Sequence, residues 1–280
     1  LKLECLQDTG SFKVRGAGNA IRSISDDRPT TGVYTMSAGN MAAAVARAGQ
    51  KFGVPTAALV PETAPETKLA AIGRWGAEVA RVPYDQWWQA VIQHEWEPWR
   101  DREFVHPFAD RRVMAGNATI ALEIVDQVPE VQEVICAYGG GGLVCGIASA
   151  LKQLKPETRI VVAEVEGAAP VRSAFEVGRP VEIPYTPSFV DGCGSKTVAD
   201  DMWPLVQNLV DDTITVSVEA VAEAVRLLAE RSRVVAEGAG AVPLAAALTL
   251  RRRGSRTVCI VSGGNIDSEK VQKILTGSVP

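Results

Sequence analysis

The sequence predicts an α/β fold built on parallel sheets, and three observations support this prediction. Short apolar runs typical of buried strands alternate with helix-type segments along nearly the whole chain. The runs are continuously apolar, which indicates strands covered on both faces, as in parallel sheets. Several of them are followed by polar loops that contain glycine, at the strand ends where α/β folds bind ligands.

The predicted elements follow one another in a regular order. A glycine can end the first long helix at residue 53, and a proline stands at the start of the next one, as is typical of helix ends. Strands are expected at 1–4, 32–36, 56–60, 78–82, 134–138, 159–165 and 257–261. Helices are expected at 41–48, 66–75, 114–125, 143–151, 217–231 and 240–250.

Composition excludes several classes of protein. The chain has 280 residues, 46% of them hydrophobic, which is enough for one large or two medium domains. A formal net charge of −4 gives no support to nucleic-acid binding. The one basic run, at 251–253, is interpreted as the decoration of a helix C-terminus. No apolar stretch reaches the roughly 18 residues of a membrane span.

The cysteines and the first residues bear on the cellular location of the protein and on where its chain begins. Five cysteines show neither paired nor metal-type spacing, so we expect buried, reduced thiols. We see no charged and apolar leader and therefore expect a cytoplasmic protein. The chain begins within a strand-like run and without an initiating methionine, so we expect preceding residues to be missing.

The most informative motif is a run of four glycines between an apolar strand and a helix of small residues. The run consists of Gly139, Gly140, Gly141 and Gly142. Without Cβ atoms, several backbone N–H groups can converge at the positive end of the helix dipole. This arrangement is suited to hold a phosphate. A flexible turn is the alternative interpretation.

Three further polar loops follow predicted strands, at 7–13, 37–40 and 262–265. Because the carboxyl ends of parallel strands meet at one edge of a sheet, we expect these loops and the glycine run to share a crevice. A tryptophan-rich stretch at 87–99 is interpreted as the packing of an amphipathic helix and the loop after it.

These motifs together resemble a known family. Residues 9–17, Thr-Gly-Ser-Phe-Lys-Val-Arg-Gly-Ala, are similar to the cofactor-lysine segment of fold-type II pyridoxal-phosphate enzymes, the group of threonine and serine dehydratases and serine racemase. Residues 37–40 resemble that group's substrate-carboxylate loop, 139–143 its phosphate loop and 262–265 its pyridine-nitrogen loop. The resemblance runs along essentially the whole chain in the expected order.

The resemblance implies a fold, a cofactor and an assembly. The expected architecture has two open, twisted, mostly parallel sheets flanked by helices, as in the β subunit of tryptophan synthase. Residues 1–31 and 109–280 would form a large domain that binds pyridoxal 5′-phosphate. Residues 32–108 would form a smaller domain with the substrate loop. A homodimer is expected, with a small amino acid as substrate and with neither nucleic acid nor membrane as a partner.

The resemblance also assigns roles to individual residues. Lys13 would join the cofactor aldehyde covalently and act as the base at the substrate Cα. Asn40 would contact the phenolic oxygen, and Ser262 the pyridine nitrogen, where a neutral hydroxyl favours β-elimination over transamination. The remaining expected cofactor contacts are Phe12, Gly139, Gly140, Gly141, Gly142, Leu143, Gly192 and Glu237. The expected substrate contacts are Ser37, Ala38, Gly39, Asn40 and Met41. The alternative role for Asn40 is a helix N-cap.

Three departures from the family pattern refine the expected reaction. Ala38 replaces the serine with which racemases move a proton on the opposite face of Cα, so racemisation is disfavoured. Met41 replaces the usual histidine and is expected to admit a larger or more apolar substrate. At the metal site of some relatives Glu166 matches the first acid, whereas Pro170 and Arg172 cannot serve, so no metal is expected.

The sequence therefore predicts a pyridoxal-phosphate-dependent ammonia-lyase. Its substrate would be a β-hydroxy L-amino acid of the L-threonine or L-serine type, converted to a 2-oxo acid and ammonia. Three alternatives stay open at this point: a serine racemase, a dehydratase for aryl-serine or hydroxyaspartate, and a cofactor-binding protein with little catalysis.

Overall fold

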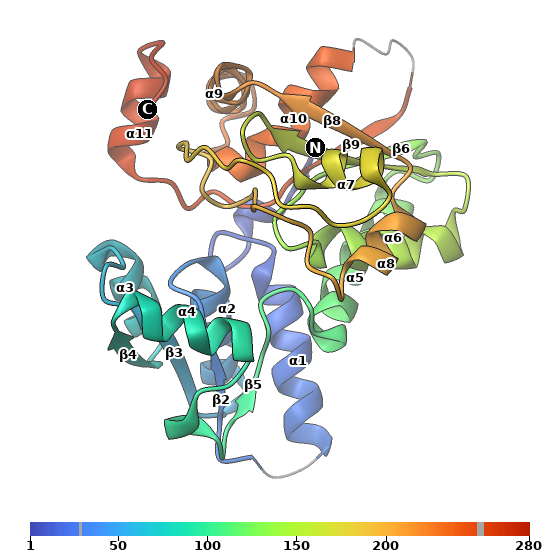
Figure 1. Cartoon of the computed structure of the whole chain (residues 1–280). Helices are drawn as coiled ribbons and strands as arrows, with labels where there is room; N and C mark the ends of the chain where they lie inside the picture. Colours follow the sequence, from blue (N-terminus) through green and yellow to red (C-terminus); the bar gives the residue numbers. More distant parts are fainter. Residues whose placement is uncertain (28–29, 251–254) are drawn as a thin grey trace. The chain divides into compact units, whose positions relative to one another are not determined.

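The computed structural model describes residues 1–27, 30–250 and 255–280, which form two compact units. The larger unit combines Leu1–Phe12 with Ala118–Pro280, and the smaller unit is Lys13–Asn117. Among the described residues each unit contains a parallel β-sheet with helices packed beside it (Figure 1). The predicted α/β fold with two parallel sheets is confirmed.

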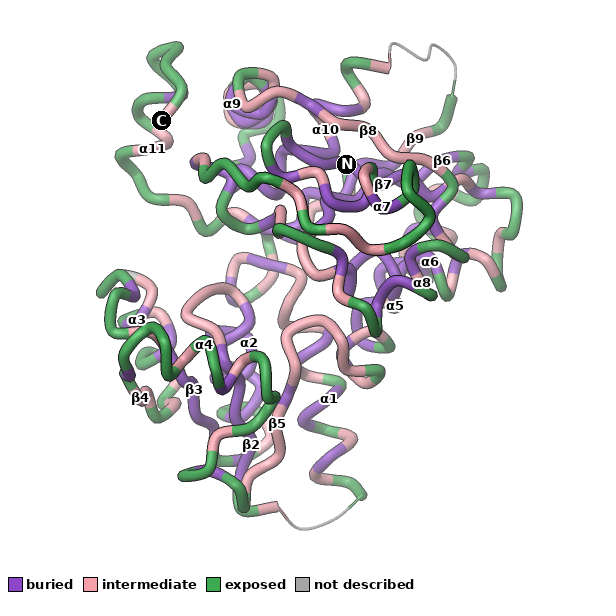
Figure 2. The backbone as a smooth tube through the Cα atoms, viewed as in Figure 1, coloured by how far each residue is buried: buried purple, intermediate pink, exposed green. Residues whose placement is uncertain are grey.

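The larger unit is built on a five-stranded sheet in the order β1-β9-β6-β7-β8, and every neighbouring pair is parallel. The strands are β1 (Lys2–Leu3), β6 (Glu133–Ala137), β7 (Arg159–Val165), β8 (Asp212–Val216) and β9 (Thr257–Val261). The two central strands β6 and β7 are buried almost along their whole length (Figure 2), which explains their continuous apolar sequence.

Helices cover the sheet of the larger unit. They are η1 (Glu4–Leu6), α6 (Gly142–Leu154), α7 (Pro170–Val177), α8 (Trp203–Leu209), α9 (Val218–Leu227), η3 (Leu228–Ser232), α10 (Gly238–Leu250) and α11 (Ser268–Leu275). Most of α10 is buried, and it packs against α9 and the sheet strands as the centre of this core. The α-helix expected at 217–231 ends at Leu227 and continues as a π-helical turn.

The smaller unit has a four-stranded sheet in the order β4-β3-β2-β5, also parallel throughout. Its strands are β2 (Val33–Thr35), β3 (Thr56–Pro61), β4 (Glu78–Val82) and β5 (Glu103–Phe104). Its helices are α1 (Lys13–Asp27), α2 (Asn40–Phe52), α3 (Glu66–Gly73), α4 (Tyr84–Gln93) and η2 (Glu97–Trp99). The helix α5 (Arg111–Gln127) contains the boundary between the two units.

The boundary between the units differs from the predicted one at 31/32 and 108/109. Residues 13–31 and 109–117 belong to the smaller unit because α1 packs tightly on α2 and on the start of α5. A Cβ at Gly116 would lie 2.2 Å from the carbonyl oxygen of Arg15, so the two helix backbones are in direct contact there. The roles of the units, one for the cofactor and one for the substrate loop, stay predictions.

Several smaller expectations can be compared with the fold. All five cysteines are free and buried, as predicted. In the tryptophan-rich stretch Trp99 is buried and the indole N–H of Trp87 donates to the carbonyl of Leu59, which confirms packing for these two side chains. Trp88, by contrast, is 46% exposed. The strand expected at 1–4 is shorter, because a 3₁₀ turn begins at Glu4. The basic run at 251–253 lies outside the described residues.

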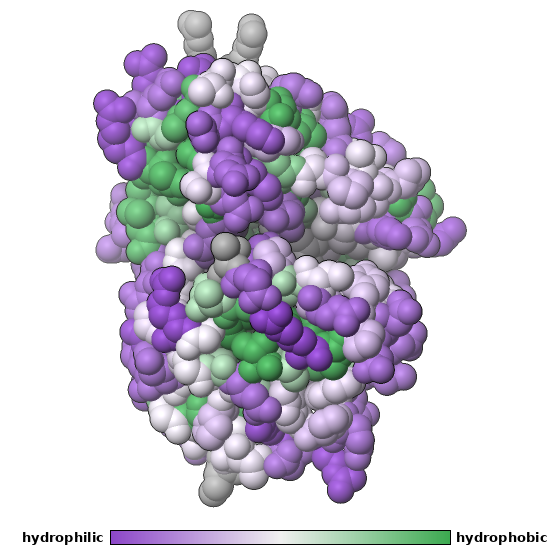
Figure 3. All heavy atoms as spheres, turned by 90° about the vertical axis from the view of Figure 1, so that its left-hand side faces the viewer, coloured by the Kyte–Doolittle hydropathy of each residue, from purple (hydrophilic) through white to green (hydrophobic). Residues whose placement is uncertain are grey.

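The surface and the helices can also be compared with the expectation of no membrane span. None of the helices within the described ranges is long and apolar enough to cross a bilayer. On the face shown in Figure 3, hydrophobic surface is interrupted by hydrophilic side chains.

Candidate active site

In the larger unit, backbone hydrogen bonds tie the lysine segment to the loop after β9. The N–H of Phe12 donates to the carbonyl of Ser262 at 2.9 Å, and the N–H of Gly264 donates to the carbonyl of Gly10 at 2.9 Å. Ser11 and Gly263 form an isolated antiparallel bridge between these two contacts. Two of the predicted loops are therefore joined, and Lys13 is the next residue in the chain after this junction.

The glycine run lies where the sequence predicts an anion site. Gly141 is the N-cap of α6 and has φ of 89°, which a residue with a side chain rarely adopts. Among the hydrogen bonds of the described residues, none is donated by the N–H groups of Gly139, Gly140 or Gly141. Consecutive N–H donors at a helix N-terminus favour an anion such as phosphate. Leu143 is buried one residue into the helix.

Other predicted cofactor residues of this unit stand where backbones approach closely. The N–H of Glu237, a buried residue, donates to the carbonyl of Gly263. A Cβ at Gly192 would lie 2.9 Å from the Cβ of Ala239 and 3.3 Å from a carboxylate oxygen of Glu237. Glycine at 192 is thus already required by packing within the protein. The sequence prediction had attributed it to the cofactor ring.

Buried hydroxyl groups without a partner provide a test of the predicted ligand. The hydroxyls of Thr9, Ser11 and Tyr138 are buried, and none has a hydrogen-bond partner in the part of the chain described. Such groups are uncommon in proteins and indicate a ligand or a water molecule. Thr9 and Ser11 belong to the lysine segment and Tyr138 precedes the glycine run, so the larger unit fits a polar, anionic cofactor at this edge. The sequence prediction did not include these three hydroxyls.

In the smaller unit, Lys13 is the first residue of α1. Its Nζ donates a hydrogen bond of 2.7 Å to the carbonyl oxygen of Pro107. The side chain is therefore held at a definite place. This contact supports a specific role for the lysine and argues against a solvated surface residue.

The loop that contains Pro107 is organised by His106. Its Nδ1 accepts the N–H groups of Phe108 at 3.2 Å and Ala109 at 2.9 Å. The pKa of His106 is lowered to about 4, because the ring is buried and lies near His94 and Lys13. His106 is therefore neutral at physiological pH. The site residues predicted from the sequence did not include His106.

The predicted carboxylate loop is also in the smaller unit. The hydroxyl of Ser37 accepts the N–H of Gly39 at 3.2 Å, and Gly39, not Asn40, is the N-cap of α2. The alternative reading of Asn40 as the helix cap is therefore wrong. Ala38 is partly buried against the neighbouring core.

Met41 lies in the hydrophobic core of the smaller unit. Its side chain is 2% exposed and belongs to the cluster formed by α1 and α2. Its predicted contact with the substrate stays a prediction.

The region predicted to lack a metal contains a buried acid that the sequence prediction missed. Glu166 is exposed, whereas Glu164 is 1% exposed and its carboxylate accepts the N–H groups of Val171 and Arg172 at the start of α7. Burial raises the pKa of Glu164 to about 7 despite these bonds. Within the described ranges, no group of three His, Cys, Asp or Glu residues could hold a metal ion.

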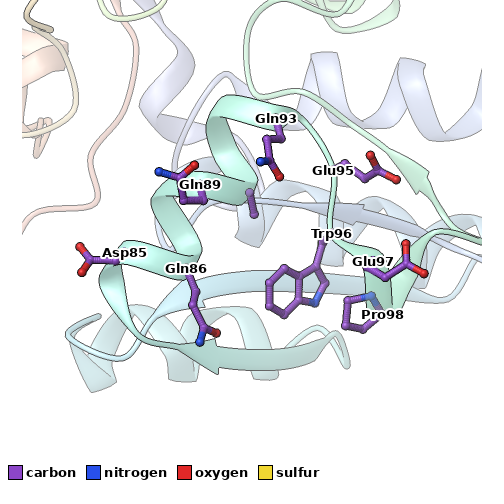
Figure 4. A pocket seen from close by; sticks show the side chains of 9 residues that line it. Asp85, Gln86, Gln89, Gln93, Glu95, Trp96, Glu97 and Pro98 are labelled. Carbon is purple, nitrogen blue, oxygen red and sulfur yellow. The ribbon is translucent and has the colours of Figure 1, made fainter.

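A cavity of about 500 Å³ lies elsewhere in the smaller unit, between α4 and the segment around η2 (Figure 4). Its walls combine glutamine, acidic and tryptophan side chains, among them Gln89, Gln93 and Trp96. None of the predicted site residues lines this cavity.

The loops and the glycine run define the class of protein. The larger unit is a parallel α/β unit with glycine N–H groups at a helix N-terminus, and Lys13 directly follows the segment bonded to the Ser262 loop. This arrangement is expected of an enzyme that binds a phosphorylated aldehyde. The family described as pyridoxal-phosphate dependent enzyme matches residues 1–263. The chain belongs to this family, and its cofactor is pyridoxal phosphate.

Individual relatives agree with this assignment. The chain is 39% identical to an L-threonine ammonia-lyase of Geobacter sulfurreducens over 98% of the chain and 69% of that protein. It is 35% identical to a serine racemase of Oryza sativa subsp. indica over 95% of the chain and 80% of that protein. Both relatives cover nearly the whole chain, so the similarity is not confined to the motifs.

Solved structures share the fold. The processed form of threonine deaminase isoform 2 from Solanum lycopersicum matches with a TM-score of 0.90 and 30% identity, over 98% of this chain and 81% of that one. Maize serine racemase matches with a TM-score of 0.88 and 33% identity, over 98% and 85% of the two chains. The predicted resemblance to fold-type II enzymes is confirmed.

Proposed function

We propose that the protein is an ammonia-lyase that converts a β-hydroxy L-amino acid of the L-threonine or L-serine type to a 2-oxo acid and ammonia. The observation that carries this proposal is the junction of Phe12 with the Ser262 loop, which precedes Lys13 directly. It supports a lysine presented to a ligand whose phosphate occupies the glycine run. Relatives named as threonine ammonia-lyases support the choice of reaction.

Specific residues are proposed to hold the cofactor. The N–H groups of the run 139–142 would bind the phosphate, and the hydroxyl of Ser262, a buried residue, would accept or donate at the pyridine nitrogen. Phe12, Asn40, Leu143, Gly192 and Glu237 would complete the contacts. When bound, pyridoxal phosphate supplies an aldehyde for covalent attachment and a ring that accepts electrons from the substrate Cα.

The chain itself would bind the substrate and move protons. Ser37, Gly39 and Asn40 would orient the substrate carboxylate. Lys13 would remove the proton from the Cα atom, and its ammonium form could then donate a proton to the departing β-hydroxyl. The product released after this elimination hydrolyses to the 2-oxo acid and ammonia.

Racemisation is the second candidate, because serine racemases are among the similar proteins. It would need a proton donor on the face of Cα opposite to Lys13. Ala38 has no ionisable group to provide one, so we expect elimination to dominate. A dehydratase for aryl-serine or hydroxyaspartate is a variant of the same proposal and differs only in the side-chain site.

The cellular location and the oligomeric state of the enzyme are further proposals. Five free, buried thiols are compatible with a reducing cytoplasm, which we propose as its location. We propose a homodimer because the family resemblance implies one.

A coupled assay for 2-oxo acids tests the proposed reaction. The purified protein is incubated with L-serine, L-threonine, an aryl-serine and hydroxyaspartate, each with and without pyridoxal phosphate. We expect cofactor-dependent 2-oxo acid from L-threonine or L-serine in equal amount with ammonia. Chiral analysis of residual serine provides the control for racemisation. Formation of D-serine without 2-oxo acid would replace the lyase proposal by the racemase.

A further inference from the structure

We propose that His106 is a positioning residue for the reactive lysine, and that it acts through the carbonyl group of Pro107. This inference rests on the proposed role of Lys13 in joining the cofactor. In this arrangement the imidazole fixes a short turn of backbone, the turn presents one carbonyl oxygen, and the oxygen holds the Lys13 amine whenever it is not bonded to the cofactor.

The first step of the argument is the double hydrogen bond on one nitrogen of the ring. Nδ1 of His106 accepts the N–H groups of both Phe108 and Ala109. An atom that accepts two hydrogen bonds carries no proton, so the ring hydrogen is on Nε2 and the ring is neutral. The two bonds fix the peptide groups just after Pro107 and thereby set the direction of its carbonyl group.

The second step is the packing that holds the ring itself. Phe108 meets His106 edge to face at 4.4 Å between ring centroids, and His94 does so at 4.7 Å. Phe104 also meets the His106 ring edge to face, at 5.6 Å between ring centroids. His94 stands at the C-terminal end of α4 with φ of 57°, a left-handed conformation that is uncommon for a residue with a side chain. These contacts leave the imidazole little freedom to rotate away from the turn.

The third step concerns charge. The ionisable groups that act on His106 are His94, Lys13 and Asp110, and Asp110 is itself paired with Arg112. Burial, His94 and Lys13 all disfavour the charged imidazolium, and they outweigh the opposite effect of Asp110. A neutral ring can stand beside an ammonium group without repelling it, whereas a cationic ring could not.

As a consequence, the Lys13 amine has a defined position. The Nζ atom of Lys13 lies 2.7 Å from the carbonyl oxygen of Pro107. Once the ammonium group has lost a proton, the neutral amine can donate one hydrogen to this oxygen and keep its lone pair available, and the carbonyl restricts the directions in which the lone pair can point. When the amine attacks the aldehyde carbon, a C=N bond forms and one water is lost. Orientation of the attacking group contributes strongly to the rates of such steps.

Two substitutions separate the proposed role from general packing. His106→Phe keeps an aromatic ring of similar size but removes the acceptor. His106→Asn keeps an acceptor that can take the two backbone N–H groups but removes the ring. The rate constant of covalent attachment is measured by absorbance after mixing cofactor-free protein with pyridoxal phosphate. Binding of pyridoxine 5′-phosphate, which has no aldehyde, is measured in parallel.

The proposal expects the two variants to differ. His106→Phe should lower the attachment rate by about 10- to 100-fold, since small displacements of a reacting group have effects of this size. His106→Asn should stay within about threefold of the wild type, because the side-chain oxygen of asparagine can accept the two backbone N–H groups that the imidazole accepts. Both variants should bind pyridoxine 5′-phosphate as the wild type does.

Three results would overturn the proposed role of His106. The first is an unchanged rate in His106→Phe, and the second is a rate in His106→Asn as low as in His106→Phe. The third is a loss of pyridoxine 5′-phosphate binding that parallels the loss of rate, which would show a general structural role, including failure to fold. If the wild type itself forms no covalent bond, the proposed function fails, and this outcome is distinct from the other three.

Discussion

The predicted site residues of the two units are held by different kinds of contact. In the larger unit the predicted cofactor residues are positioned mainly by backbone atoms: the lysine segment and the Ser262 loop are joined by N–H and carbonyl groups, and the predicted phosphate site consists of glycine N–H groups. In the smaller unit the contacts come from side chains, namely the Lys13 amine, the His106 imidazole and the Ser37 hydroxyl.

This difference determines which substitutions each set of residues tolerates. A site made of closely packed backbone tolerates no added Cβ, so its sequence is constrained whatever the ligand is. A site made of side chains can change its chemistry by single substitutions while its fold is retained. We therefore expect cofactor binding to depend on the packing of the larger unit, and the reaction to depend on the side chains of the smaller unit.

The largest expected effect is that of removing the lysine amine. Lys13→Ala should lower turnover by about 10⁴-fold or more, because it removes both the covalent attachment and the base. The phosphate site in the larger unit would be intact, so pyridoxine 5′-phosphate should still bind. Steady-state kinetics and equilibrium binding check the two statements. Turnover close to that of the wild type would contradict the division between the units.

Much of the larger unit could be predicted from sequence, because its strands are continuously apolar. The strands at 159–165 and 257–261 have the predicted bounds. The strand β8, Asp212–Val216, was missed: four of its five residues are only partly buried, and its sequence alternates threonine with apolar residues. The glycine run and its position at the start of α6 were also predicted, because backbone conformations of this kind require glycine, and its role as a phosphate site stays a prediction.

Less of the smaller unit's site could be predicted, for a physical reason. The hydrogen bond from Lys13 to Pro107 joins residues 94 positions apart. The carbonyl oxygen of Pro107 leaves no signature in the sequence. The direction of Met41 could not be determined either, because its neighbours are all small and apolar. The burial of Glu164 could not be inferred from alternation, because β7 is buried on both faces.

A pair of glycine substitutions sharpens the comparison through stability. A Cβ at Gly240 in α10 would lie 2.4 Å from the backbone oxygen of Gly263, so Gly240→Ala should destabilise the protein by about 3 kcal/mol. Gly18 in α1 has open space around it, and Gly18→Ala should stabilise by about 0.5–1 kcal/mol, because alanine favours a helix. Urea unfolding measures both changes. Equal effects in the two variants would contradict the claim that packing demands glycine at 240 and not at 18.

The stability contributions of His106 and Glu164 should respond to pH with opposite signs. His106 has a folded-state pKa of about 4, below its usual 6.5, so its contribution to stability is present above pH 6.5 and is lost as pH falls toward 4. Glu164 has a folded-state pKa of about 7, above its usual 4.5, so its contribution is present below pH 4.5 and is lost as pH rises through 7.

Substitution separates these two contributions. His106→Asn should reduce the acid-side loss of stability, and Glu164→Gln should reduce the loss between pH 4.5 and 7, each by about 2 kcal/mol across its window. Unfolding free energies at several pH values between 4 and 8 provide the measurement. A variant with the same pH slope as the wild type would show that the corresponding group titrates normally.

A small effect is expected from the removal of a single hydroxyl. Tyr138 is 1% exposed and its hydroxyl has no hydrogen-bond partner among the described residues. Tyr138→Phe should therefore stabilise the cofactor-free protein by about 1 kcal/mol, since an unpaired buried hydroxyl is unfavourable. Thermal unfolding without cofactor gives the value. A loss of stability would show that the hydroxyl is bonded, to an ordered water for example.

Covalent trapping followed by peptide mapping tests the central claim most directly. The protein is saturated with pyridoxal phosphate, reduced with borohydride, digested and analysed by mass spectrometry. We expect the pyridoxyl group on Lys13 and a matching loss of label in the presence of excess pyridoxine 5′-phosphate. A label on another lysine, or none at all under saturating cofactor, would contradict the assignment of Lys13 and the function proposed from it.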